Sequence, residues 1–112
     1  VYQAFARKPM PESLQRTQSI DVRLSYQNAI EGRANRDDRE ALAGMANCIM
    51  VLAEKHCIAA DLEAAQAAQM ALLRADARVM QGKAWNFDGE GRQAILRAMD
   101  MFDELVALLG AA

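Results

Sequence analysis

The chain has 112 residues, the size of one ordinary globular domain and too short for a second core. Apolar residues make up 53% and charged residues 25%, and Ala and Leu far outnumber the β-branched residues that favour strands. With a formal net charge of −2, these values exclude a disordered chain, a sheet protein and a strongly basic nucleic-acid binder.

Residues 1–11 are predicted to form an extended arm, because Pro9 and Pro11 disfavour helical backbone in the residues that precede them. Pro11 also suits the first turn of a helix, and helical spacing of apolar residues predicts that helix over residues 12–33. Its stripe is patchy and is formed by Ile20, Val22, Leu24, Tyr26, Ala29 and Ile30.

A second helix is predicted to begin near Asp37, which can cap it while Glu40 reaches back from three residues further on. Apolar residues then repeat at intervals of three and four, and the residues between them leave little polar surface. We expect a central, largely buried helix whose core stripe is Leu42, Met45, Ala46, Ile49, Leu52, Ala53 and His56.

A third helix is predicted after a break near residues 55–58, with Asp61 as its cap. Its expected stripe is Leu62, Ala65, Gln69, Leu72, Leu73, Val79 and Met80. Small side chains allow two helices to approach closely, so we expect tight packing on the side that carries Ala59, Ala60, Ala64, Ala65, Ala67, Ala68 and Ala71.

Residues 81–91 are rich in turn-forming residues and surround Trp85 and Phe87. Asp88 or Gly89 can cap a fourth helix over residues 90–109, and this helix has two apolar faces. We expect the first face, Ile95, Met99, Phe102, Val106 and Leu109, to fill the core. The second face would be an unusually large exposed patch, so we predict that it forms a protein interface. The predicted interface consists of Ala94, Ala98, Met101, Leu105 and Leu108, with Met70 of the third helix beside them.

No reactive cluster stands out in the sequence. His56 is adjacent to Cys57 and near Glu54, but neighbouring residues on a helix point in different directions, and one histidine is too few for a helical di-metal site. Residues 86–91 resemble the start of a calcium loop, yet the position that needs a bidentate Glu is Arg97. We therefore expect no catalytic residue, no metal and no cofactor.

Two rival functions remain open on the sequence alone. One is a nucleic-acid-associated regulator that uses the basic first third, Arg7, Lys8, Arg16, Arg23, Arg33, Arg36 and Arg39, although these residues alternate with acids as on a solvated face. The other is an enzyme with an active site shared between two chains, where Asp100, Asp103 and Glu104 would meet Glu54 or His56.

The start of the chain does not have the order of a secretory signal, and its longest uncharged run, residues 41–53, is shorter than the roughly 20 residues that span a bilayer. We expect a cytoplasmic protein with no membrane association and with Cys48 and Cys57 as free thiols. Because the chain begins with Val and not with Met, we also expect that a further N-terminal segment precedes it.

Together these patterns predict an all-α fold, an antiparallel bundle of about four helices, with an arm at residues 1–11 and a single domain over residues 12–112. Abundant apolar helical surface without a reactive cluster favours a non-enzymatic interaction module. The working hypothesis is a small bacterial-type regulatory or adaptor protein that binds other protein and forms a homodimer, through the fourth helix or through the alanine-rich side of the third.

Overall fold

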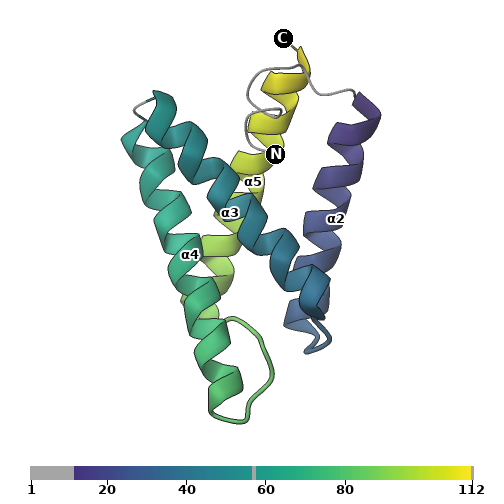
Figure 1. Ribbon diagram of the computed structural model, residues 1–112, viewed down its shortest axis with the longest axis vertical. Coiled ribbons are helices and arrows are strands. Elements are labelled where there is room, and N and C mark those ends of the chain that lie inside the picture. Colours follow the sequence, from purple (N-terminus) through teal and green to yellow (C-terminus); the bar gives the residue numbers. More distant parts are fainter. Residues whose placement is uncertain (1–11, 57, 112) are drawn as a thin grey trace.

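The computed structural model describes residues 12–56 and 58–111, and over these residues the chain is entirely helical apart from its turns. The helices are α2 (Glu12–Ile30), α3 (Arg36–His56), α4 (Ala59–Met80) and α5 (Gly89–Ala111) (Figure 1). The predicted all-α antiparallel bundle is confirmed. The predicted arm at residues 1–11 lies outside the described residues. Over the described ranges, no helix combines the length and the apolar character that a membrane crossing requires.

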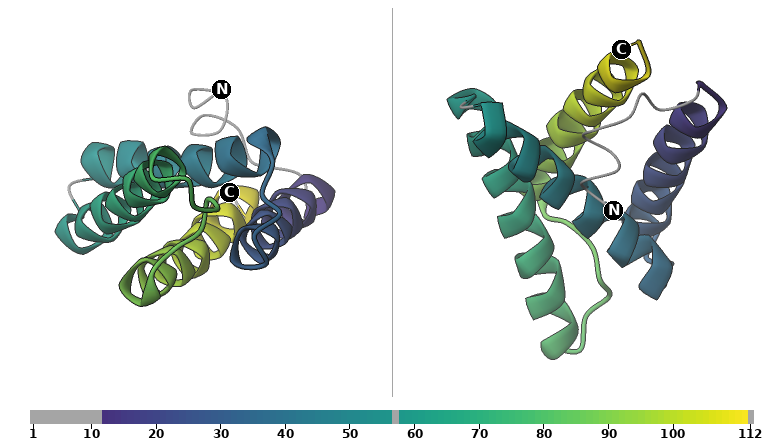
Figure 2. Two further views of the ribbon diagram at one scale, coloured as in Figure 1. Left: turned by 90° about the horizontal axis from the view of Figure 1, so that it is seen from below. Right: turned by 45° about the horizontal axis from the view of Figure 1, so that its top comes forward.

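Helix α5 lies between α2 and α4, and α3 crosses the layer that these three helices form (Figures 1 and 2). Successive helices run in alternating directions along the chain (Figure 1). Helices α3 and α5 each contact all three other helices, so the helix that the sequence predicted to be central, α3, shares that position with α5.

Helices α2 and α4 end in the same way, at a glycine with left-handed backbone. Gly32 has φ of 74° and Gly82 has φ of 79°. At each end the glycine N–H and the next N–H donate to carbonyls of the last helical turn, as in Arg33 N to Asn28 O at 2.7 Å and Lys83 N to Arg78 O at 2.9 Å. Helix α2 therefore ends at Ile30, three residues before the predicted end at Arg33.

The cap of α3 differs from the predicted pair Asp37 and Glu40. Asn35 caps the helix instead, because its Oδ1 accepts from the Asp38 N–H at 2.9 Å and the Asp38 carboxylate accepts from the Asn35 N–H at 3.0 Å. The buried Asp38 also accepts from Ser25 Oγ at 3.1 Å and from Asn28 Nδ2 at 3.2 Å. Two side chains of α2 thus select this cap.

The predicted cap of the next helix, Asp61, is also displaced. Helix α4 begins at Ala59 after Ile58, which makes no side-chain cap hydrogen bond, and Asp61 lies inside the first turn. There its carboxylate is placed favourably for the helix dipole. By contrast, Asp88 does cap α5, since its Oδ1 accepts from the Gly91 N–H at 2.6 Å.

The core is formed by the predicted stripes of α3 and α5, the alanines of α4 and two residues of α2. Its largest fully buried side chains are Leu42, Met45, Ile49, Ile95, Met99 and Val106. Several residues that were expected on core stripes are exposed instead: Leu24, His56, Leu73, Val79 and Met80. On α4 the core takes mainly the small residues, among them Ala64, Ala65, Ala68, Ala71 and Ala75, together with Leu72, and most of the large residues remain outside.

Residues 81–88 connect α4 to α5 and fasten this end of the bundle through an aromatic cluster, Tyr26, Trp85 and Phe87. The Phe87 ring stacks on Tyr26 with centroids 6.1 Å apart and meets Trp85 edge-on at 5.2 Å. Trp85 Nε1 donates to the Asp76 carboxylate at 2.7 Å, and the Arg39 guanidinium lies 5.5 Å from the Trp85 ring centroid. The cluster joins α2, α3 and α4 to the connecting segment.

Candidate functional site

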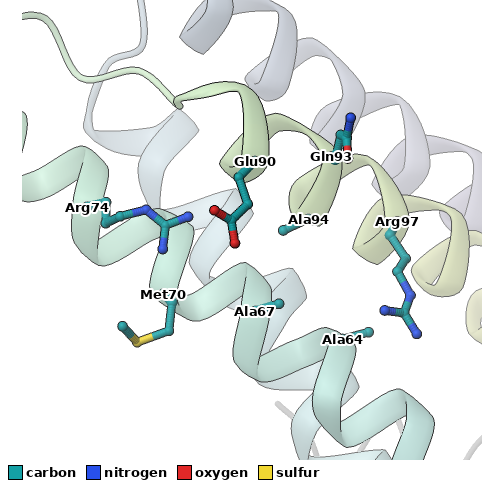
Figure 3. Close-up of a pocket in the computed structure, with 8 residues that line it drawn as sticks. All are labelled: Ala64, Ala67, Met70, Arg74, Glu90, Gln93, Ala94 and Arg97. Carbon is teal, nitrogen blue, oxygen red and sulfur yellow. The ribbon is translucent and has the colours of Figure 1, made fainter.

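A groove of about 420 Å³ runs between α4 and α5. Its apolar lining comes from three alanines, Ala64 and Ala67 on α4 and Ala94 on α5. Figure 3 shows Arg74 and Arg97 toward its two ends, with Glu90 reaching over the groove between them and Met70 at the outer edge of α4. Gln93 completes the lining.

Short side chains and one helix cap hold the two walls of this groove together. A Cβ atom at Gly91 would lie 3.3 Å from the Ala71 Cβ and 2.8 Å from the Asp88 carboxylate, so the start of α5 can approach α4 only with glycine there. Arg74 also donates to Asp88 at 3.2 Å across the two elements. The bond from the Gly91 N–H, with a smaller contribution from Arg74, lowers the pKa of the Asp88 carboxyl.

The adjoining surface of α4 carries an apolar stripe that faces away from the core. Met70, Leu73, Ala77 and Met80 follow one another at intervals of three, four and three residues, which places them on one side of a helix. Met70 is 52% exposed, Leu73 60% and Met80 89%. We call these four residues the outer face of α4.

The structure distributes the predicted interface residues over two different surroundings. Ala98 is fully buried in the core of its own chain, while Ala94, Met101 and Leu105 are half-buried and pack against that core. The side chain of Leu108 lies outside the described residues. The physical reason is that α5 sits between α2 and α4, so its second apolar face turns toward α4 and is largely covered within the chain. Met70 alone among the described members of the set is widely exposed.

In the basic first third of the chain, three of the four arginines whose side chains are described pair with neighbouring acids. Arg23 pairs with Asp100 at 3.3 Å and with Asp103, and these bonds, the one to Asp103 foremost, raise the pKa of Arg23. Arg33 pairs with Glu31, and Arg36 with Glu40 at 3.0 Å. Arg39 lies over the Trp85 ring. Such balanced pairs do not form the continuous basic patch that a phosphate backbone requires. Arg7, Lys8 and the side chain of Arg16 lie outside the described residues.

The candidate catalytic residues do not meet within one chain. Asp100 and Asp103 bind Arg23 of α2, whereas His56 is exposed at the far end of α3, beside the connection to α4 (Figure 1). Burial raises the pKa of the Cys48 thiol to about 11, which suppresses the reactive thiolate. Among the residues that the structure describes, no group of three or more His, Cys, Asp or Glu is placed to hold a metal ion. Cys57 lies outside that part.

Sequence reasoning missed the outer face of α4, because Leu73 and Met80 were expected to be in the core. A signal for it was present: the alanines lie on the opposite side of the same helix, and small residues mark the side on which helices pack closely. No family model, curated protein or solved structure matches the chain.

Proposed function

We propose that this chain is a non-enzymatic protein–protein interaction module that self-associates, in the manner of a small regulatory or adaptor protein. The observation that carries the proposal is the outer face of α4, where large apolar side chains are exposed on the side of the helix opposite the core. Exposed apolar stripes of this kind mark surfaces that other protein covers.

Burial of the exposed apolar side chains of this surface favours contact with another protein. Complete burial of a Leu or Met side chain contributes about 1.5–3 kcal/mol, so side chains that are half exposed or more each contribute about 1–2 kcal/mol on docking. Met70, Leu73 and Met80 would supply such a gain from each partner. The alanine-lined groove beside Met70 adds a shallow surface against which a second helix can rest.

The outer face of α4 supports self-association better than the second face of α5 that the sequence favoured. On α5 the chain covers Ala98 completely and Met101 and Leu105 in large part, which leaves little apolar area for another molecule. On α4 the corresponding side chains remain in water. We therefore propose that the contact surface is on α4 and not on α5. Met70 belongs both to this surface and to the interface that the sequence predicted.

The test is the mass in solution, measured by light scattering over a dilution series of the wild-type chain and of two variants. The wild type is expected to have twice the 12.3 kDa of one chain at high concentration. Leu73→Glu should raise the dissociation constant at least tenfold, because it places an unpaired carboxylate in an apolar contact.

Leu24→Glu is the matched control, since Leu24 of α2 is 57% exposed against 60% for Leu73. This variant should change the dissociation constant less than twofold. A wild-type chain that stays monomeric at every concentration would exclude self-association. Equal effects of the two substitutions would instead remove the outer face of α4 as the contact surface.

A further inference from the structure

Charged residues are unevenly distributed along α4. The first half of the helix carries Asp61 and Glu63, and the second half carries Arg74 and Arg78. The third acid, Asp76, accepts from Trp85 Nε1 and is held by the aromatic cluster. Glu63 and Arg78 are therefore the α4 charges that lie next to the outer face toward its two ends, because Asp61 is on another side of the helix and Arg74 is paired with Asp88.

We propose that a second copy of the chain packs its own α4 antiparallel against this helix, with the two-fold axis between Met70 and Leu73. The inference rests on the proposed self-association and adds its partner, orientation and register. In an antiparallel pair the acidic half of each helix lies beside the basic half of the other. A parallel pair would place Glu63 level with Glu63 and Arg78 level with Arg78, so neither side chain would have an opposite charge at its level.

The position of the axis follows from two requirements, full overlap of the helices and contact between apolar side chains. With the axis between residues 70 and 73, Met70 of each copy lies level with Leu73 of the other, at the centre of the contact. Gln66 lies level with Ala77, and Met80 lies within one residue of the level of Leu62. Helix α4 covers residues 59–80, so this register overlaps residues 63–80 of the two copies, all but the first turn of the helix.

The same register brings Glu63 near Arg78 of the second copy. At 100° per residue the two side chains share the flank of α4 that turns toward α5, and a two-fold antiparallel pair brings the same flank of both helices together. Their levels differ by about 3 Å along the helix axes, which a guanidinium can reach. Arg78 uses its Nε for the Ala84 carbonyl at 3.2 Å, and a guanidinium has further N–H donors for a carboxylate.

The orientation can be tested by cross-linking two single-cysteine variants, Gln66→Cys and Ala77→Cys, each combined with Cys57→Ser. Both positions are exposed, so the substitutions should leave the fold intact. Cys48 can stay, because it is buried and its pKa of about 11 leaves almost no thiolate at pH 7. The probe is a short bis-maleimide, and light scattering first checks that each variant keeps the wild-type mass.

We expect a cross-linked dimer when the two variants are mixed. When either variant is treated alone, the yield of cross-linked dimer should be less than one-tenth of that of the mixture. In the proposed register Gln66 of one copy is level with Ala77 of the other, whereas the two Gln66 residues are about 16 Å apart along the axis. Efficient cross-linking of Gln66→Cys alone, or a dimer that no combination cross-links, would overturn the antiparallel register while self-association stands. A monomeric wild type would overturn both proposals.

Discussion

The aromatic cluster and the outer face of α4 are both made of large apolar side chains, yet one is buried and the other is exposed. Trp85 and Phe87 are each 4% exposed, because residues from α2, α3 and α4 surround them. Leu73 is 60% exposed on the outside of the bundle. The difference shows that large apolar residues of a short connection can be buried as part of the core, while those of a regular helix can remain exposed.

The largest effect is expected at Trp85, where a substitution tests whether the aromatic cluster stabilises the fold. Trp85→Ala should lower the free energy of unfolding by about 3–5 kcal/mol, because it leaves a cavity in the aromatic cluster and removes the contact with Arg39. Chemical denaturation followed by circular dichroism measures the change. A loss below about 1 kcal/mol would mean that the connection contributes little to the fold.

Trp85→Phe is the control that keeps the variant folded. It retains an aromatic ring and removes the Nε1 bond to Asp76, so the expected loss is only about 1–1.5 kcal/mol. A loss as large as that of Trp85→Ala would show that the phenyl ring does not replace the indole, and that the packing of a ring at this position contributes little by itself.

The next largest effect is expected at the start of α3, where the cap differs from the predicted one. Asp38→Ala should cost about 2 kcal/mol, because it removes the acceptor for Ser25, Asn28 and the Asn35 N–H. The matched control is Asp37→Ala, one residue earlier and exposed, which should change the free energy of unfolding by less than about 0.5 kcal/mol. The reverse order of the two effects would restore Asp37 as the cap.

How far the sequence predicted this molecule depends on whether local or tertiary contacts decide each feature. Most of the stripes of α3 and α5 were predicted correctly, because large residues such as Ile49 and Phe102 repeat on one side of each helix. The exceptions are His56, which is exposed, and Leu109, whose side chain lies outside the described residues. The cap of α3 was not predicted correctly, because the observed pair, Asn35 and Asp38, has the same spacing as the predicted pair, Asp37 and Glu40. Ser25 and Asn28, which decide between them, come from another helix.

The candidate site was predicted less well than the fold, and the reason lies in α4. Hydrophobic spacing assigned Leu72 and Leu73 alike to the core, although only Leu72 faces it. Size decided the outcome, because the close approach of α4 to its neighbours selects the side that carries Ala65, Ala68 and Ala71. On α5 the two apolar faces were identified, but the sequence does not show that α2 and α4 lie on either side of it.

The smallest expected effect is at Asp88, which lies between the two regions: it follows Phe87 of the aromatic cluster and binds Arg74 of the groove. Its pKa is lowered in the folded chain, so it contributes stability above the unfolded pKa of about 3.9, and this stability is lost as the pH falls through the folded value. Denaturation midpoints from pH 6 down to pH 2 should therefore show wild type above Asp88→Asn at pH 6 and the two converging below pH 4. Arg74→Gln should keep most of this convergence, because the Gly91 N–H is the larger cause of the shift. If Arg74→Gln abolished the convergence, the ion pair across the groove, and not the helix cap, would hold the start of α5.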